Sequence, residues 1–124
     1  MRLVVIESPY ASPLNGGVAA NIHYARRCLR DCLRRGEAPL ASHLLYTQDD
    51  VLDDSKPEER AIGIRAGHAW YVAAKACIVY VDQGISNGMR AGVAAAKGAG
   101  VVVEFRSLHG DREKVTAAMG EFSW

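Results

Sequence analysis

The chain has 124 residues, a length typical of one domain and sufficient for a hydrophobic core. Hydrophobic residues make up 49% of the chain and charged residues 23%, a balance that argues against disorder. Because the formal net charge is only +1, the chain lacks the basic field expected of a protein whose main partner is nucleic acid or an anionic membrane.

The sequence also bears on compartment and redox state. No apolar run approaches the roughly 18 residues that a membrane-spanning helix needs. The apolar stretch near the N-terminus is too short for a signal peptide, so we expect a cytoplasmic protein, in the host cytoplasm if a phage encodes it. The three cysteines, Cys28, Cys32 and Cys77, have no CxxC spacing, which favours reduced thiols that fill space over a disulfide or a metal pair.

The N-terminal part of the chain predicts a strand, a loop and a helix. Residues 3–6, LVVI, form a continuous apolar run typical of a strand that is covered on both faces. Residues 7–17 are rich in Pro, Gly, Ser and Asn and predict a loop. Apolar residues then recur with helical spacing from Val18 to Leu33, and Gly36 stands where the helix would end. The arginines of this segment lie mostly on the other helix face, which predicts a solvated surface.

The rest of the chain repeats the alternation. Residues 38–46 predict a short second strand that leads into a turn, followed by an acidic loop. Helical spacing over about residues 57–74 predicts a second helix. Residues 77–81, CIVYV, predict a second fully apolar strand, and residues 101–105, VVVEF, predict a fourth strand, with a helix rich in small residues between them. Residues 107–124 predict a last short helix or an arm that contacts a partner.

Apolar strands that alternate with helices predict one α/β domain over residues 1–124, a Rossmann-like three-layer domain with a mostly parallel sheet of four to five strands. Right-handed crossovers in such a sheet place ligands at the carboxyl ends of the strands. Those ends carry residues 7–10, Ser42 with His43, and residues 82–88. The pattern therefore predicts a site where these three stretches meet.

The stretch VYVDQGISNGMRAG, residues 79–92, predicts a strand, a glycine-rich turn and a helix start. A helix N-terminus offers free N–H groups and a partial positive charge that suit a phosphate, and Arg90 can pair with an anion if it points inward. The alternative is structural, with Ser86 or Asn87 as the N-cap and Asp82 closing the turn. The ligand-binding candidates here, besides Arg90, are Gly84, Ser86, Asn87, Gly88 and Met89.

Two further candidates follow the first and second strands. Glu7 ends the first strand, where a carboxylate would face the crevice, and the loop after it carries Ser8, Pro9 and Tyr10. Tyr10 can stack on a base or hydrogen-bond a sugar, although Ser-Pro-Tyr is also a rigid loop exit. His43 can act as an acid, a base or a phosphate donor, or be structural, and Ser42 precedes it.

No metal or cofactor is expected from the sequence. None of the four histidines has metal-ligand spacing with Cys or a carboxylate. The acidic cluster over residues 49–54 lacks the EF-hand alternation and predicts a solvated loop. Trp70 is interpreted as a core or interface residue rather than a ligand platform, and no GxSxG nucleophile elbow is present.

The segments VVIESPY and VYVDQGISNGMRAGVAAAKGAG resemble the nucleoside 2-deoxyribosyltransferase-like superfamily, and in particular its small phage and bacterial members of unknown function. The resemblance covers about residues 2–105. It implies a flavodoxin-like fold, a homo-oligomer, and a site for a nucleoside or a nucleoside 5′-monophosphate. Active members attack the anomeric carbon of the sugar with a carboxylate, as a retaining glycosidase does.

The resemblance also identifies a departure from the superfamily. Asp82 matches the first acid of the transferase motif Asp-x-Gly-Thr-x-x-Glu, and the nucleophilic glutamate of that motif falls on Gly88. In two other forms of the motif the nucleophile falls on Arg90 or on Gly92, so the usual nucleophile is absent in every alignment. Catalysis, if it occurs, would then use Glu7 or Asp82.

Two functions follow from this resemblance. The first is an enzyme, a nucleotide N-glycosidase or a deoxyribosyltransferase-like hydrolase that cleaves or transfers at the N-glycosidic bond. The second is a non-catalytic module that binds or sequesters a nucleotide, such as a phage accessory protein.

Overall fold

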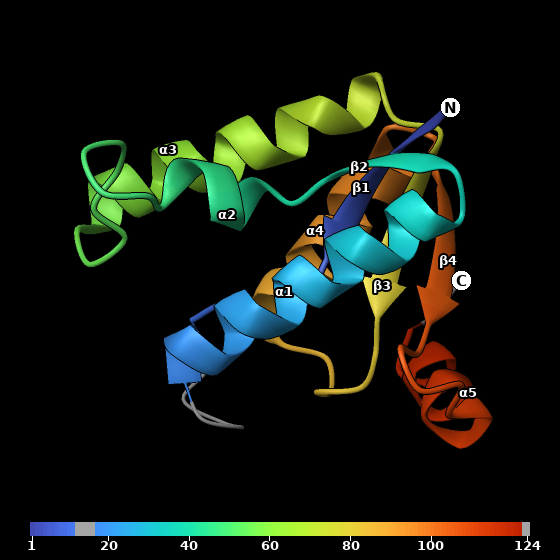
Figure 1. Cartoon of the computed structure of the whole chain (residues 1–124). Helices are drawn as coiled ribbons and strands as arrows, with labels where there is room; N and C mark the ends of the chain where they lie inside the picture. The colour runs from blue at the N-terminus through green and yellow to red at the C-terminus, as the bar shows by residue number, and fades with distance from the viewer. Residues whose placement is uncertain (12–16, 123–124) are drawn as a thin grey trace.

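The computed structural model describes residues 1–11 and 17–122 (Figure 1). Residues 12–16, which belong to the loop expected after the first strand, and residues 123–124 lie outside the described residues. Four strands form one sheet: β1 (Arg2–Glu7), β2 (Glu37–Leu40), β3 (Ala76–Tyr80) and β4 (Val102–Arg106). Their spatial order is β2-β1-β3-β4, and each neighbouring pair is parallel. The expected parallel α/β sheet is therefore confirmed.

Helices cover both faces of the sheet (Figure 1). The helical segments are α1 (Gly17–Arg34), α2 (Ser42–Tyr46), α3 (Pro57–Ala69), the 3-10 helix η2 (Trp70–Val72), α4 (Asn87–Gly98) and α5 (Arg112–Gly120). Helix α5 corresponds to the last short helix that was one of the two expectations for residues 107–124. Among the described helices, none is long and apolar enough to cross a membrane.

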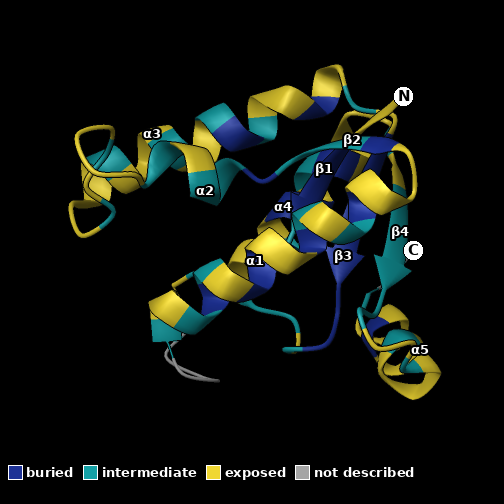
Figure 2. Ribbon diagram, in the orientation of Figure 1, coloured by how far each residue is buried: buried dark blue, intermediate teal, exposed yellow. Residues whose placement is uncertain are grey.

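The core has one cluster on each face of the sheet, because successive side chains of a strand point to opposite faces. Val4, Ile6 and Ile78 pack against α1, while Val5 and Val79 pack against α4 and η2. Figure 2 shows β1 and β3 as the buried centre of the molecule. The expected space-filling thiols are confirmed, since all three cysteines are free and buried: Cys28, Cys32 and Cys77.

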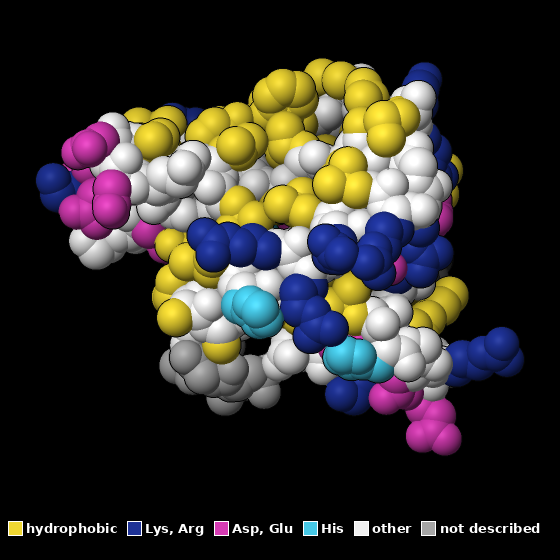
Figure 3. Space-filling model, viewed as in Figure 1, with side chains coloured by type: hydrophobic (Ala, Val, Ile, Leu, Met, Phe, Trp, Pro, Cys, Tyr) yellow, Lys and Arg dark blue, Asp and Glu magenta, His cyan; other side chains and the backbone are white. Residues whose placement is uncertain are grey.

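The outer face of α1 is the solvated surface that the sequence predicts. Its arginines, and the one just beyond its end, are exposed: Arg26, Arg27, Arg30, Arg34 and Arg35. Figure 3 shows Lys and Arg side chains gathered in a band over α1, while the buried side of the helix packs on the sheet.

Two predicted segments need correction. Residues 38–46 do not continue as a strand and turn, because the strand ends at Leu40 and α2 occupies Ser42–Tyr46. Helix α2 has only five residues and no side-chain cap, so it lacks the sequence signals of a longer helix. The helix expected over about residues 57–74 ends at Ala69 and tightens into η2. Trp70, which begins η2, keeps 45% of its surface exposed and donates a hydrogen bond from Nε1 to Tyr46 Oη at 2.8 Å.

Candidate functional site

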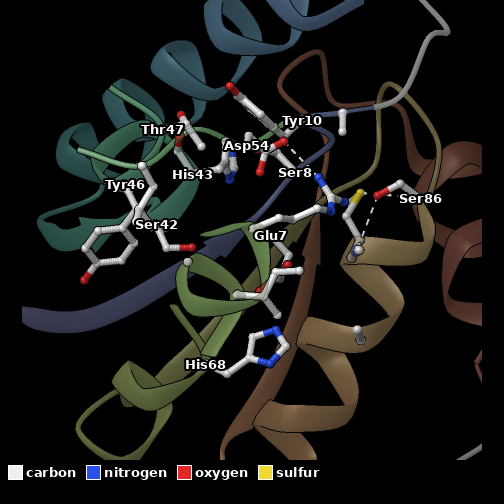
Figure 4. Close-up of a pocket in the computed structure, with 18 of the residues that line it drawn as sticks. Glu7, Ser8, Tyr10, Ser42, His43, Tyr46, Thr47, Asp54, His68 and Ser86 are labelled. Atoms are coloured by element: carbon white, nitrogen blue, oxygen red, sulfur yellow. Dashed lines mark hydrogen bonds and ion pairs between the residues drawn. The ribbon is translucent and has the colours of Figure 1, made fainter. Parts of the chain in front are cut away.

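A cavity of about 510 Å³ lies where the carboxyl end of β1 meets α2, α3 and the start of α4. This volume is in the range of small-molecule sites. Figure 4 shows Glu7 in its middle, with Ser42 and Tyr46 on one side and Ser86 on the other. The lining residues include Glu7, Ser8, Tyr10, Ser42, His43, Tyr46, Asp54, Glu59, Arg60, His68, Ser86, Asn87, Gly88 and Met89.

Glu7 reaches the cavity from the end of β1, on the sheet face that α4 covers. Its carboxylate lies directly beside Gly92 of α4, so close that a Cβ atom on Gly92 would overlap both carboxylate oxygens. We call this space the Gly92 notch. Tyr71 Oη donates a short hydrogen bond to Glu7 Oε2. Burial raises the pKa of Glu7 to about 7, although the hydrogen bond from Tyr71 opposes this rise.

Ser8, Tyr10 and His43 form a second group in the lining. Ser8 Oγ lies 3.2 Å from His43 Nε2, and the rings of Tyr10 and His43 have centroids 5.5 Å apart. Burial lowers the pKa of His43 to about 4, so its imidazole is neutral at physiological pH. A neutral imidazole and a serine hydroxyl can each donate and accept hydrogen bonds, which suits the uncharged edges of a base or sugar.

The N-terminus of α4 forms the third part of the lining. Ser86 is its N-cap, because Ser86 Oγ accepts a hydrogen bond from Met89 N at 3.2 Å. The next two residues, Asn87 and Gly88, carry N–H groups that have no partner within an α-helix. Ser86 therefore caps the helix while also lining the cavity, so the structural and ligand-binding interpretations of this turn are compatible.

Asp82 does not line the cavity. Its buried carboxylate accepts hydrogen bonds from Tyr24 Oη at 2.6 Å, Ser107 Oγ at 2.5 Å and Leu108 N at 2.9 Å. Burial opposes ionisation, but the hydrogen bonds from Ser107 and Tyr24 outweigh it and lower the pKa of Asp82. This carboxylate joins the end of β3 to α1 and to the segment that precedes α5.

Arg90, Gly84 and Pro9, which we expected at the site, also lie outside the lining. One helical residue turns by about 100°, so Arg90 points away from the side on which Met89 and Gly92 face the sheet. Its guanidinium pairs with Glu121 and lies 5.6 Å from the centroid of the Phe122 ring. In this structure Arg90 therefore does not meet the condition under which it would pair with an anion in the cavity.

Several lining residues were not anticipated from the sequence, and they come from α2, α3 and the loop between them. Arg60 is the only lysine or arginine among the described lining residues, and its Nη1 pairs with Asp54 Oδ2 at 2.9 Å. His68 lines the cavity too, and its ring centroid is 6.4 Å from that of Tyr71. Among the described residues, no group of three or more His, Cys, Asp and Glu is placed to hold a metal.

Comparisons with known proteins agree with this fold. The chain has the fold of the nucleoside 2-deoxyribosyltransferases: it is similar to a solved 2-deoxyribosyltransferase from the psychrotolerant bacterium Bacillus psychrosaccharolyticus. The TM-score is 0.59 at 17% sequence identity, over 85% of this chain and 72% of the other. Residues 2–106 match the model of a domain of unknown function, DUF7768, so the chain belongs to that family. A comparison with curated proteins found no match. The resemblance inferred from the sequence is thus confirmed at the level of the fold.

Proposed function

We propose that the cavity binds a nucleoside or a nucleotide-like small molecule and that Glu7 acts on its N-glycosidic bond. The observation that carries this proposal is the position of the Glu7 carboxylate. It fills the Gly92 notch on α4 and lines the cavity, so a carboxylate is present at one of the positions where the superfamily nucleophile would begin. The carboxylate arrives from β1 instead of from the helix.

The chemistry required of Glu7 is that of a retaining glycosidase. One carboxylate oxygen bonds to the anomeric carbon while the bond from that carbon to the base breaks, and the base leaves with the electron pair and takes a proton from solvent water. Water or a second base then attacks the same carbon, and the carboxylate is released. A pKa of about 7 leaves a substantial fraction of Glu7 ionised at neutral pH.

The rest of the lining supports a nucleoside-like ligand. Tyr10 and the neutral His43 offer ring surfaces and uncharged hydrogen-bonding groups for the base. For a phosphate group, the candidates in the same cavity are Arg60 and the start of α4. We propose Arg60, rather than Arg90, as the cation that meets an anionic ligand.

A non-catalytic binding module is the second candidate, and one observation favours it. None of the three helix positions to which the superfamily nucleophile aligns, Gly88, Arg90 and Gly92, carries a carboxylate, and burial makes ionisation of Glu7 less favourable. Such a module would hold its ligand with the same groups and release it intact.

The test combines thermal shift with mass analysis over a panel of ribo- and deoxyribonucleosides and their 5′-monophosphates. Binding to the native state raises the melting temperature, and free base in the recovered ligand reports cleavage. We expect Glu7→Gln to abolish base release while retaining binding, and Glu58→Gln, an exposed carboxylate on α3, to behave like wild type. Binding without release would favour the second candidate, and no stabilisation by any ligand would reject both.

A further inference from the structure

Tyr71 connects Glu7 to the interior of the protein. It belongs to η2 and is only 1% exposed, although its hydroxyl contacts a residue that lines the cavity. Tyr71 Oη donates to Glu7 Oε2 and lies 3.2 Å from Cys77 Sγ on β3. Three elements that are separate in sequence, β1, η2 and β3, thus meet at one hydroxyl group.

The direction of these hydrogen bonds follows from the number of protons. A tyrosine hydroxyl has one proton, and when that proton is donated to Glu7 the Cys77 thiol must be the donor to Tyr71. The chain of hydrogen bonds therefore runs from Cys77 through Tyr71 to Glu7. Among the described residues, Tyr71 is the only hydrogen-bond partner of Glu7, and it engages only Oε2.

We propose that Tyr71 is a positioning residue that holds the carboxylate of Glu7 in the Gly92 notch through Oε2 and leaves Oε1 available to the ligand. The catalytic consequence rests on the proposed function, but the orientation of Glu7 does not. Fixing one oxygen of a carboxylate nucleophile helps the other to attack, because a freely rotating side chain would lose the alignment that makes the attack efficient.

The effect of Tyr71 on Glu7 can be measured because the two dominant influences on the carboxylate oppose each other. Burial raises the pKa of Glu7, and the hydrogen bond from Tyr71 lowers it. Removing the hydroxyl leaves burial alone, so the carboxylate should gain its proton at a higher pH. The other titratable or charged groups around the cavity and Tyr71 are Tyr10 after β1, His43 and Tyr46 on α2, Asp54 before α3, Glu59, Arg60 and His68 on α3, and Cys77 on β3.

The experiment is an NMR titration of the free protein with ¹³C-labelled glutamate, in which Glu7→Gln identifies the Glu7 signal. In Tyr71→Phe we expect the Glu7 midpoint to move up by about one pH unit, since the ring stays and only the donor is lost. Tyr80→Phe is the matched control. Tyr80 is also fully buried, and it donates to Asp31 on the opposite side of the sheet.

The outcomes separate this proposal from the proposed function. An unchanged or lower midpoint in Tyr71→Phe, or an equal rise in Tyr80→Phe, would overturn the positioning role whether or not the protein is an enzyme. If Tyr71→Phe does not fold, 3-fluorotyrosine at residue 71 is a stronger donor and should move the midpoint down; an unchanged midpoint would overturn the proposal. Where base release is detected, Tyr71→Phe should lower kcat more than it raises KM. The acid limb of the profile of kcat against pH should also move to higher pH. A loss confined to KM would count against the proposal.

Discussion

The carboxylate of Glu7 occupies the space in which a side chain on Gly92 would begin. Gly92 lies on the buried face of α4, and Glu7 ends the neighbouring strand β1. The two positions therefore compete for one volume, and the absence of a side chain on α4 is what admits the carboxylate from β1. This relationship links the stability of the fold directly to the proposed chemistry.

Gly92→Ala should be less favourable for stability with Glu7 than with Glu7→Ala, by about 1–2 kcal/mol. With Glu7 present, the new methyl group displaces the carboxylate and breaks its hydrogen bond to Tyr71, which costs about 1–2 kcal/mol. With Glu7→Ala, the methyl group meets no carboxylate, and alanine favours a helix over glycine by about 1 kcal/mol. Thermal or denaturant unfolding of the four proteins of this double-mutant cycle measures the coupling. Additive effects would show that the two residues do not share the space.

Glu7→Gln should stabilise the fold above neutral pH. The pKa of Glu7 is about 7 in the folded chain and about 4.5 in the unfolded chain, so between these values the folded state binds more protons. Wild-type stability therefore falls as pH rises through that window, by about 3 kcal/mol in total. Glu7→Gln removes this loss, so its advantage over wild type should grow from pH 5 to pH 8 in urea unfolding. Glu58→Gln should show no such trend, and a parallel trend in both variants would refute the assignment to Glu7.

Arg60→Gln should weaken the binding of nucleoside monophosphates more than that of the matching nucleosides. A charge-assisted hydrogen bond contributes about 1.5–3 kcal/mol, which corresponds to a loss of about tenfold to a hundredfold in affinity. Arg90→Gln is the control, because Arg90 pairs with Glu121 outside the cavity. Calorimetric titration with both ligands measures the difference, and an equal loss for nucleoside and nucleotide would mean that Arg60 does not contact the phosphate.

The fold was predictable because its central strands are continuous apolar runs in the sequence. The apolar runs over residues 3–6 and 77–81 are typical of strands that are covered on both faces, and they became the central strands β1 and β3. Helix α2 was not predictable, since five residues without a capping side chain give no periodic signal. Parallel strands also bring their carboxyl ends together, which is why Glu7, Ser8 and His43 were expected near one another.

The other part of the site depends on tertiary contacts that no local pattern encodes. Arg60 and His68 belong to α3, and their positions in the sequence do not predict that this helix packs near the end of β1. The position of Arg90 depends on the rotation of α4 about its axis, which the packing of Met89 and Val93 against the sheet determines. A basic residue after a glycine-rich turn is compatible with either orientation.

Asp82→Asn should act mainly on stability, because the three donors to Asp82 come from the fold and not from the cavity. An amide has one acceptor oxygen, so at least one of the donors Tyr24, Ser107 and Leu108 would lose its partner, at a cost of about 1–3 kcal/mol. The pKa of Asp82 is lowered in the folded chain, so its contribution is present above the ordinary aspartate pKa and is lost as pH falls below it. The difference in unfolding free energy between wild type and Asp82→Asn should therefore shrink from pH 6 to pH 3. If Asp82→Asn instead kept full stability and lost base release as completely as Glu7→Gln, Asp82 would be the catalytic carboxylate, and the position of Glu7 would need another explanation.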